Sequence, residues 1–295
     1  MINWGYMDSK TILQRYMNLP KFIYLLQESA LYLPKMSKFE DHLEGGLTAK
    51  DFISRSNDAA IIDIAMNSLW PTVNEKPEHR RIRLEQVDSM KRTLDARTFE
   101  TPFGSYCCND VEKLFSRCRE WIYVSCWHRS HHECSAMWSL YGTDKNSVCI
   151  FTTEEKLRDQ IQQEDGTNTT ILHDVEYLDH KSSTLDKCSL APFTSKALPF
   201  CFEKELRIIS YNPKIDLNVA TDNSASGEIL LIKSLSQLID KILISPKADP
   251  WFASSIKRLC SAYELNIEIT ESSLRTKRVE TFYDAAKQLS CSALQ

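Results

Sequence analysis

The spacing of apolar and polar residues along this chain predicts short strands mixed with helices. Apolar runs rich in β-branched and aromatic residues, separated by polar turns, are typical of strands, and apolar positions three or four residues apart are typical of helices. Strands are expected at 11–16, 31–33, 121–126, 148–151, 171–177, 202–209, 228–232, 241–244 and 265–269. Helices are expected at 20–29, 48–97 (broken near Pro71 and Pro77), 132–141, 250–264 and 279–290, with a further one ending near Arg119.

Helices gather early in the chain and strands later, with little strict βαβ alternation, which predicts an α+β protein. The 295 residues suit one large domain. We expect a single domain over 1–295. Its core sheet would come from 11–33 and 121–270, with a helical insertion at 48–119 and a C-terminal helix at 279–290.

The run Phe202-Glu203-Lys204-Glu205-Leu206-Arg207-Ile208-Ile209 carries the most chemistry. As a strand it would point Glu203, Glu205 and Arg207 to one face, with the two carboxylates about 7 Å apart. Such a pair suits the stabilisation of a cation or the handling of a proton. The ordinary interpretation is a half-buried strand with a solvated charged face.

Composition narrows the class of protein. The chain has 42 % hydrophobic and 26 % charged residues, which is the composition of a globular protein. Its net charge of −4 provides no overall positive potential that would attract nucleic acid. With 7 glycines and neither GxGxxG nor GxxxxGK[ST], a Rossmann or P-loop enzyme is not expected. No signal peptide or membrane-spanning run is found, and ten irregularly spaced cysteines fit free thiols, so a cytoplasmic location is expected.

A polar cluster follows the strand expected at 121–126. It contains Cys126, His128, His131, His132 and Cys134. Cysteine and histidine are zinc ligands, but the spacing fits neither paired C-x₂-C knuckles nor HExxH, so no metal is expected. A cysteine nucleophile with a histidine base is a weakly specified alternative, because sequence does not reveal which side chains meet. A loop with buried cysteines is the ordinary interpretation.

Two further pairs have a functional and an ordinary interpretation. Trp138 and Tyr141 are three residues apart on one predicted helix face, where they would pack in the core or flank a planar ligand. Arg15 beside Tyr16, on the first predicted strand, is either a surface arginine or a clamp for phosphate.

Several of these segments together resemble the bacterial domain of unknown function 2971 family. The segments that carry the resemblance are Arg15-Tyr16-Met17, Phe39-Glu40-Asp41-His42-Leu43-Glu44-Gly45, Val124-Ser125-Cys126-Trp127, Met137-Trp138-x-x-Tyr141, Val148-Cys149-Ile150-Phe151 and Phe202-Glu203-Lys204-Glu205-Leu206-Arg207. They match that family's motifs in order and spacing over roughly residues 11–270. His42 stands where the family has proline, and Leu206 where it has tryptophan.

The same layout is similar to that of ADP-ribosyltransferases, whose order is Arg, Ser and Glu-x-Glu. The resemblance implies a split mixed sheet and NAD-dependent ADP-ribosyl transfer. Arg15 and Tyr16 would hold NAD, and Trp138 or Tyr141 would flank its nicotinamide. Ser125 would orient the late glutamate or the ribose, Glu205 would stabilise the oxocarbenium-like transition state, and Glu203 would position or deprotonate the acceptor.

The function implied is that of a bacterial toxin or phage-defence effector that uses NAD and modifies a protein or nucleic acid. An antitoxin or other partner protein would accompany it, and no membrane would be involved. Two alternatives stay open from the residues. One is a non-catalytic ligand-binding or interaction module in which the Glu-x-Glu face is a structural salt-bridge strand. The other is a nuclease or other hydrolase that uses Glu203, Glu205 and the histidines.

Overall fold

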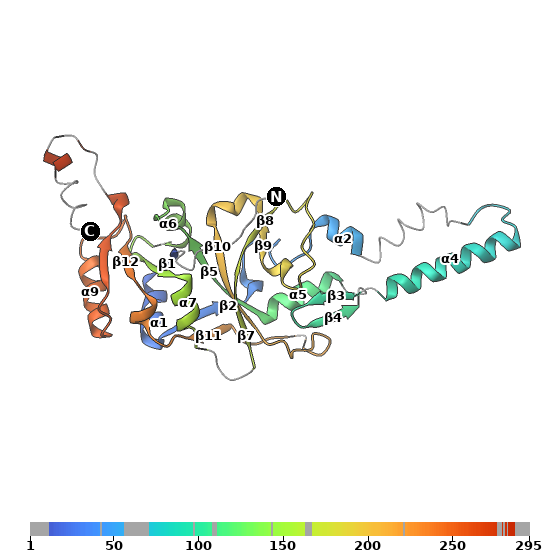
Figure 1. Cartoon of the computed structure of the whole chain (residues 1–295), viewed down its shortest axis with the longest axis horizontal. Coiled ribbons are helices and arrows are strands. Elements are labelled where there is room, and N and C mark those ends of the chain that lie inside the picture. Colours follow the sequence, from blue (N-terminus) through green and yellow to red (C-terminus); the bar gives the residue numbers. More distant parts are fainter. Residues whose placement is uncertain are drawn as a thin grey trace. The chain divides into compact units, whose positions relative to one another are not determined.

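The computed structural model describes residues 12–41, 43–55, 71–96, 98–107, 111–142, 144–162, 167–220, 222–275, 279, 281 and 283–286. The protein is mixed α+β, as its sequence predicts (Figure 1). The chain divides into two compact units. Unit 1 comprises Met1–Glu28, Ser130–Leu157 and Ser234–Gln295, and unit 2 comprises Ser29–Arg129 and Arg158–Lys233.

Unit 1 is built on a mixed run of strands in the order β13-β12-β6-β1. The β1–β6 and β6–β12 pairs are antiparallel, and β12–β13 is parallel. The elements are β1 (Ile12–Asn18), α1 (Leu19–Glu28), α6 (Ser135–Tyr141), β6 (Ser147–Thr153), α7 (Glu154–Gln160, which the unit boundary divides), α8 (Leu235–Leu238), β12 (Lys241–Ile244), α9 (Phe252–Ala262), β13 (Glu268–Glu271) and the 3-10 helix η5 (Ser273–Arg275).

Unit 2 contains the antiparallel run β5-β10-β7 and smaller two-stranded pairs. Its strands are β2 (Ala30–Pro34), β3 (Thr98–Thr101), β4 (Gly104–Cys107), β5 (Ile122–Arg129), β7 (Thr169–Asp174), β8 (Glu176–Leu178), β9 (Ser195–Ala197), β10 (Glu205–Tyr211) and β11 (Gly227–Leu231). Its helices are α2 (Ala49–Arg55), α4 (Pro77–Asp95), α5 (Val111–Trp121) and the 3-10 helices η1 (Met36–Lys38), η3 (Ala191–Phe193) and η4 (Leu198–Glu203).

The predicted helical insertion at 48–119 contains a β-hairpin as well as helices. Strands β3 and β4 pair around a two-residue turn at Pro102 and Phe103. Proline is incompatible with a helix interior, and Gly104 takes a φ of +114°, which suits a turn rather than a helix. The Thr101 hydroxyl closes the turn by donating to the Gly104 carbonyl (2.8 Å).

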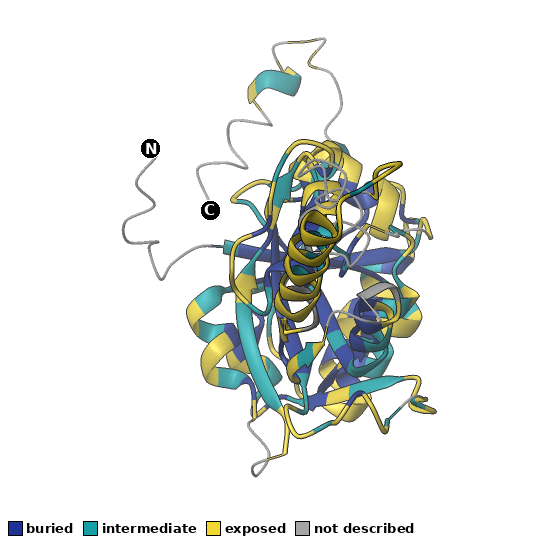
Figure 2. Cartoon of the chain, turned by 90° about the vertical axis from the view of Figure 1, so that its right-hand side faces the viewer, coloured by how far each residue is buried: buried dark blue, intermediate teal, exposed yellow. Residues whose placement is uncertain are grey.

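Apolar packing in unit 2 joins this hairpin to α5 and to the β5–β10 pair. Phe99, Phe115, Val124 and Ile209 belong to one buried cluster. Helix α4, by contrast, has no buried side chain between residues 77 and 93, and Figure 2 shows most of its ribbon as exposed.

The C-terminal part of the prediction is described only in part. Of the helix expected over 279–290, residues 283–286 are helical and 287–290 lie outside the described residues. Within the described part of the chain, no helix combines the length and the apolar character needed to cross a lipid bilayer.

Candidate functional site

Five charged side chains of unit 2 are buried together: Glu44, Lys196, Glu203, Glu205 and Arg207. We call them the buried ionic network. Charged residues are almost never fully buried unless they are paired, so a group of five is the feature of unit 2 that most needs a chemical explanation.

Lys196, at the centre of β9, connects all three carboxylates of the network. Its ammonium lies 2.6 Å from Oε2 of Glu203, 3.0 Å from Oε1 of Glu205 and 3.3 Å from Oε1 of Glu44. The ammonium donates hydrogen bonds to Glu203 and Glu205 and forms an ion pair with Glu44. The carboxylates and the burial act in opposite directions on its pKa, and the net effect raises the pKa of Lys196.

Arg207, on β10, holds the other side of the network. Its Nε donates to Oε2 of Glu205 (2.8 Å), its Nη1 donates to the Phe193 carbonyl (2.9 Å), and its Nη2 pairs with Glu44. The guanidinium also lies 5.8 Å from the centre of the Phe39 ring. All three nitrogens of the Arg207 guanidinium therefore have a partner, and the group stays protonated and positively charged.

The turn residues of the Glu44 loop explain how that carboxylate reaches the network. Gly45 has a φ of +75° and donates its N–H to the Pro192 carbonyl (2.9 Å). A Cβ at this position would lie 2.8 Å from Cγ of Arg119, so the close approach requires glycine.

The protonation states of the two late glutamates differ. Burial, together with the neighbouring Glu205, raises the pKa of Glu203 from 4.5 to about 7 despite its contact with Lys196. Burial also acts to raise the pKa of Glu205, but Arg207, Glu203 and Lys196 overcome it and lower that pKa to about 2. Three carboxylates and two cations carry a net charge of −1, and one proton on Glu203 makes the network neutral.

The predicted strand over residues 202–204 is wrong. Leu198–Glu203 forms the 3-10 helix η4, with a proline in its first turn, and Lys204 takes a left-handed conformation (φ 43°, ψ 55°) before β10 begins at Glu205. Proline favours the start of a helical turn, and a left-handed residue ends it. A tight turn, and not strand periodicity, therefore brings Glu203 beside Glu205.

Ser125 does not share a face with Glu205. In the β5–β10 pair, Ser125 lies opposite Ile208, whereas Glu205 lies opposite His128. Because side chains alternate along a strand, Ser125 and Glu205 point to opposite faces of the sheet, so Ser125 does not orient that glutamate as predicted. Its buried hydroxyl finds no hydrogen-bond partner among the described residues.

The predicted NAD-binding residues all lie in unit 1, and the two on β1 do not share a face. Arg15 and Tyr16 are consecutive on β1 and therefore point to opposite faces. Tyr16 packs edge-on against Trp138, with ring centres 4.8 Å apart, and Trp138 is 5 % exposed. Tyr141 is 40 % exposed. Tyr16 and Trp138 are core residues, which confirms the core-packing interpretation for Trp138, whereas the exposure of Tyr141 does not fit that interpretation.

The histidines of the polar cluster have separate environments. His128 is buried with its Nδ1 2.6 Å from the Glu203 carbonyl, and burial lowers its pKa. His131 and His132 are exposed, and burial raises the pKa of the Cys126 thiol, which disfavours the thiolate that a nucleophile needs. Among the described residues, no three His, Cys, Asp or Glu side chains are grouped so that they could hold a metal ion.

Two members of the network were not predicted. Glu44 lies in the segment 39–45 that carries part of the family resemblance, but nothing in that motif indicates that it pairs with Lys196 and Arg207. Lys196 comes from a segment that the sequence places in a polar loop, and no sequence signal identified it.

The pKa of Glu203 predicts how stability depends on pH. A carboxyl whose pKa is raised on folding stabilises the protein below its unfolded pKa of 4.5, and this stabilisation is lost as the pH rises to about 7. In Glu203→Gln the side chain is uncharged at every pH and has nearly the shape of a protonated glutamate. The free energy of unfolding of the variant minus that of the parent should therefore increase between pH 5 and pH 8, by on the order of 1–3 kcal/mol.

Urea unfolding at several pH values measures this difference. Glu176→Gln is the control, because Glu176 is an exposed glutamate on β8, and its difference from the parent should stay flat. A flat difference for Glu203→Gln would show that Glu203 is ionised throughout this range.

Comparison with family models, curated proteins and solved structures finds no match. The resemblance to the domain of unknown function 2971 family stays a prediction from the motifs.

Proposed function

We propose that this chain is a non-catalytic ligand-binding or interaction module whose Glu203–Glu205 segment has a structural role. One observation carries the proposal. Glu205 is 4 % exposed, and its two carboxylate oxygens are occupied by Lys196 and Arg207. A carboxylate that must stabilise a substrate cation needs an oxygen directed at the substrate.

The energetics of the network support the same proposal. A buried ion pair that loses one partner leaves an uncompensated charge, which is strongly destabilising. Releasing Glu205 to a substrate would leave Arg207 and Lys196 buried with less counter-charge, and the network would be disrupted. We infer that it fixes the positions of the Glu44 loop, β9, η4 and β10 relative to each other.

ADP-ribosyl transfer is the second candidate, and one observation favours it. Glu203 and Glu205 lie side by side with their pKa values moved apart, which is the pattern of acid–base pairs in active sites. In this candidate NAD is the substrate, a protein or nucleic acid is the acceptor, and the ribose would have to displace Lys196 from Glu205.

Nicotinamide release from NAD separates the two candidates. We expect the purified chain to release no more nicotinamide than buffer alone, because Glu205 has no open oxygen. The measurement is chromatography of the reaction mixture over hours, with the parent, Glu205→Gln and the exposed-site control Glu176→Gln. Release by the parent and by Glu176→Gln, but not by folded Glu205→Gln, would show that cleavage of NAD depends on Glu205 and would reject the non-catalytic module.

A further inference from the structure

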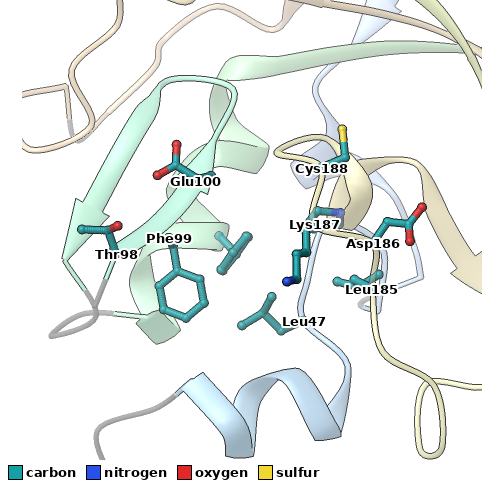
Figure 3. A pocket seen from close by; sticks show the side chains of 10 residues that line it. Leu47, Thr98, Phe99, Glu100, Leu185, Asp186, Lys187 and Cys188 are labelled. Carbon is teal, nitrogen blue, oxygen red and sulfur yellow. The ribbon is translucent and has the colours of Figure 1, made fainter. Parts of the chain in front are cut away.

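Unit 2 contains a cavity that the buried ionic network does not use. Its volume is about 230 Å³, and its walls combine an apolar part with several polar side chains (Figure 3). The apolar part is formed by Leu47, Phe99, Phe115, Leu185 and Pro192. Cavities with an apolar lining and a few polar groups are the usual sites of small-molecule binding.

The aromatic wall of this cavity is held firmly. Phe99 comes from β3 and Phe115 from α5, and both are core residues of unit 2. Their rings meet edge to face, with centres 5.7 Å apart at 88°. A ligand ring that packs against them would meet surfaces that are already ordered, which reduces the entropy cost of binding.

Lys187, an exposed residue, is the one basic residue that lines the cavity in the described part of the chain, beside the acidic residues Glu100 and Asp186. Figure 3 shows its side chain extending toward Leu47 and Phe99, whereas the Asp186 carboxylate points away from them. Among the described residues, none hydrogen-bonds or ion-pairs with the Lys187 ammonium. Glu100, the other acidic residue of the wall, accepts a hydrogen bond from the Ser105 hydroxyl. The group that Lys187 is free to bind is therefore an anion.

We propose that this cavity binds a small aromatic carboxylate, with its ring against Phe99 and Phe115 and its carboxylate on Lys187. The size supports a single ring, because cavities for drug-sized ligands span roughly 300–1,000 Å³ and this one is smaller. The inference deepens the proposed function and rests on it, since it names the ligand class of the binding module.

Phenylacetate is the first probe, and titration calorimetry on the full chain is the measurement. Phenylacetamide has the same ring without the charge, and inorganic phosphate has charge without a ring. We expect phenylacetate to bind and both comparison compounds to bind about tenfold more weakly or not detectably, because a hydrogen bond to a charged group contributes on the order of one factor of ten or more.

Lys187→Met keeps most of the aliphatic stem and removes the ammonium, so phenylacetate should bind about tenfold more weakly while the variant remains folded. Lys181→Met is the matched control, because Lys181 is exposed nearby in the same segment and does not line the cavity. Its affinity for phenylacetate should equal that of the parent.

Cys188 provides a second readout. This exposed thiol lines the cavity, while the exposed thiols of Cys107 and Cys201 do not. Phenylacetate should slow the alkylation of Cys188 by iodoacetamide, measured by peptide mass spectrometry, and leave the other two unchanged.

Three results would overturn the inference: no phenylacetate binding at tens of millimolar, equal binding by the parent and Lys187→Met, or binding of phosphate alone. None of them bears on nicotinamide release, so the binding module would stand with another ligand. Release of nicotinamide together with Lys187-dependent phenylacetate binding would reject the module and keep the cavity as a ligand site.

Discussion

Replacing Glu205 by glutamine is expected to lower the free energy of unfolding by about 3–5 kcal/mol, the cost of removing one partner from a buried ion pair. Glutamine keeps the shape and one acceptor oxygen. It removes the charge that faces Lys196 at 3.0 Å and Arg207 at 2.8 Å. Within the network, the two buried cations would then keep only Glu44 and Glu203 as neighbouring carboxylates. Urea unfolding at pH 7 measures the loss.

Glu176→Gln makes the same chemical change at an exposed position of β8. It should change the free energy of unfolding by no more than about 0.5 kcal/mol, as surface substitutions usually do. Equal, small effects of the two substitutions would mean that Glu205 is hydrated in solution and that the network contributes little.

Arg207→Met is expected to cost at least as much as Glu205→Gln, again about 3–5 kcal/mol. Arg207 is fully buried and holds two carboxylates and the Phe193 carbonyl. Methionine is apolar and flexible enough to fill the space of the arginine stem, so the loss reports the charge more than the packing.

The double variant Glu205→Gln/Arg207→Met makes this prediction specific. Once the arginine is absent, the Glu205 charge has lost its strongest partner, so removing it should restore part of the stability. The loss in the double variant should be smaller than the sum of the single losses by about 1–3 kcal/mol, measured by urea unfolding of all four proteins. Additive losses would show that the two side chains do not depend on each other.

The sequence predicted most of the regular elements because their signals are local. The strands β1, β5 and β6 are rich in apolar, β-branched and aromatic residues, and α1 and α9 have helical apolar spacing. The turn at residues 198–204 was missed because a short 3-10 helix has little periodicity. The hairpin at 98–107 was missed because its strands have only four residues each.

The site was harder to predict, for two different reasons. Whether Ser125 and Glu205 point to the same face of the sheet depends on the pairing register of β5 and β10. Nothing in the sequence of either strand determines that register. By contrast, Arg15 and Tyr16 are adjacent on a predicted strand, so their opposite directions followed from the sequence itself. Of the two partners of Glu205, Arg207 was expected on the same strand face, whereas Lys196 has no motif that identifies it. Glu44, which pairs with both cations, could not be foreseen because it is far away in the chain.

The distance along the chain between the members of the network has a consequence for how the protein folds. Glu44 and Arg207, which pair directly, are 163 residues apart in the sequence. Closing a loop of this length costs entropy, and a charge that is buried before its partners arrive is strongly unfavourable. We expect the network to assemble after the folding transition state, so that its contacts chiefly slow unfolding and protect the folded chain kinetically.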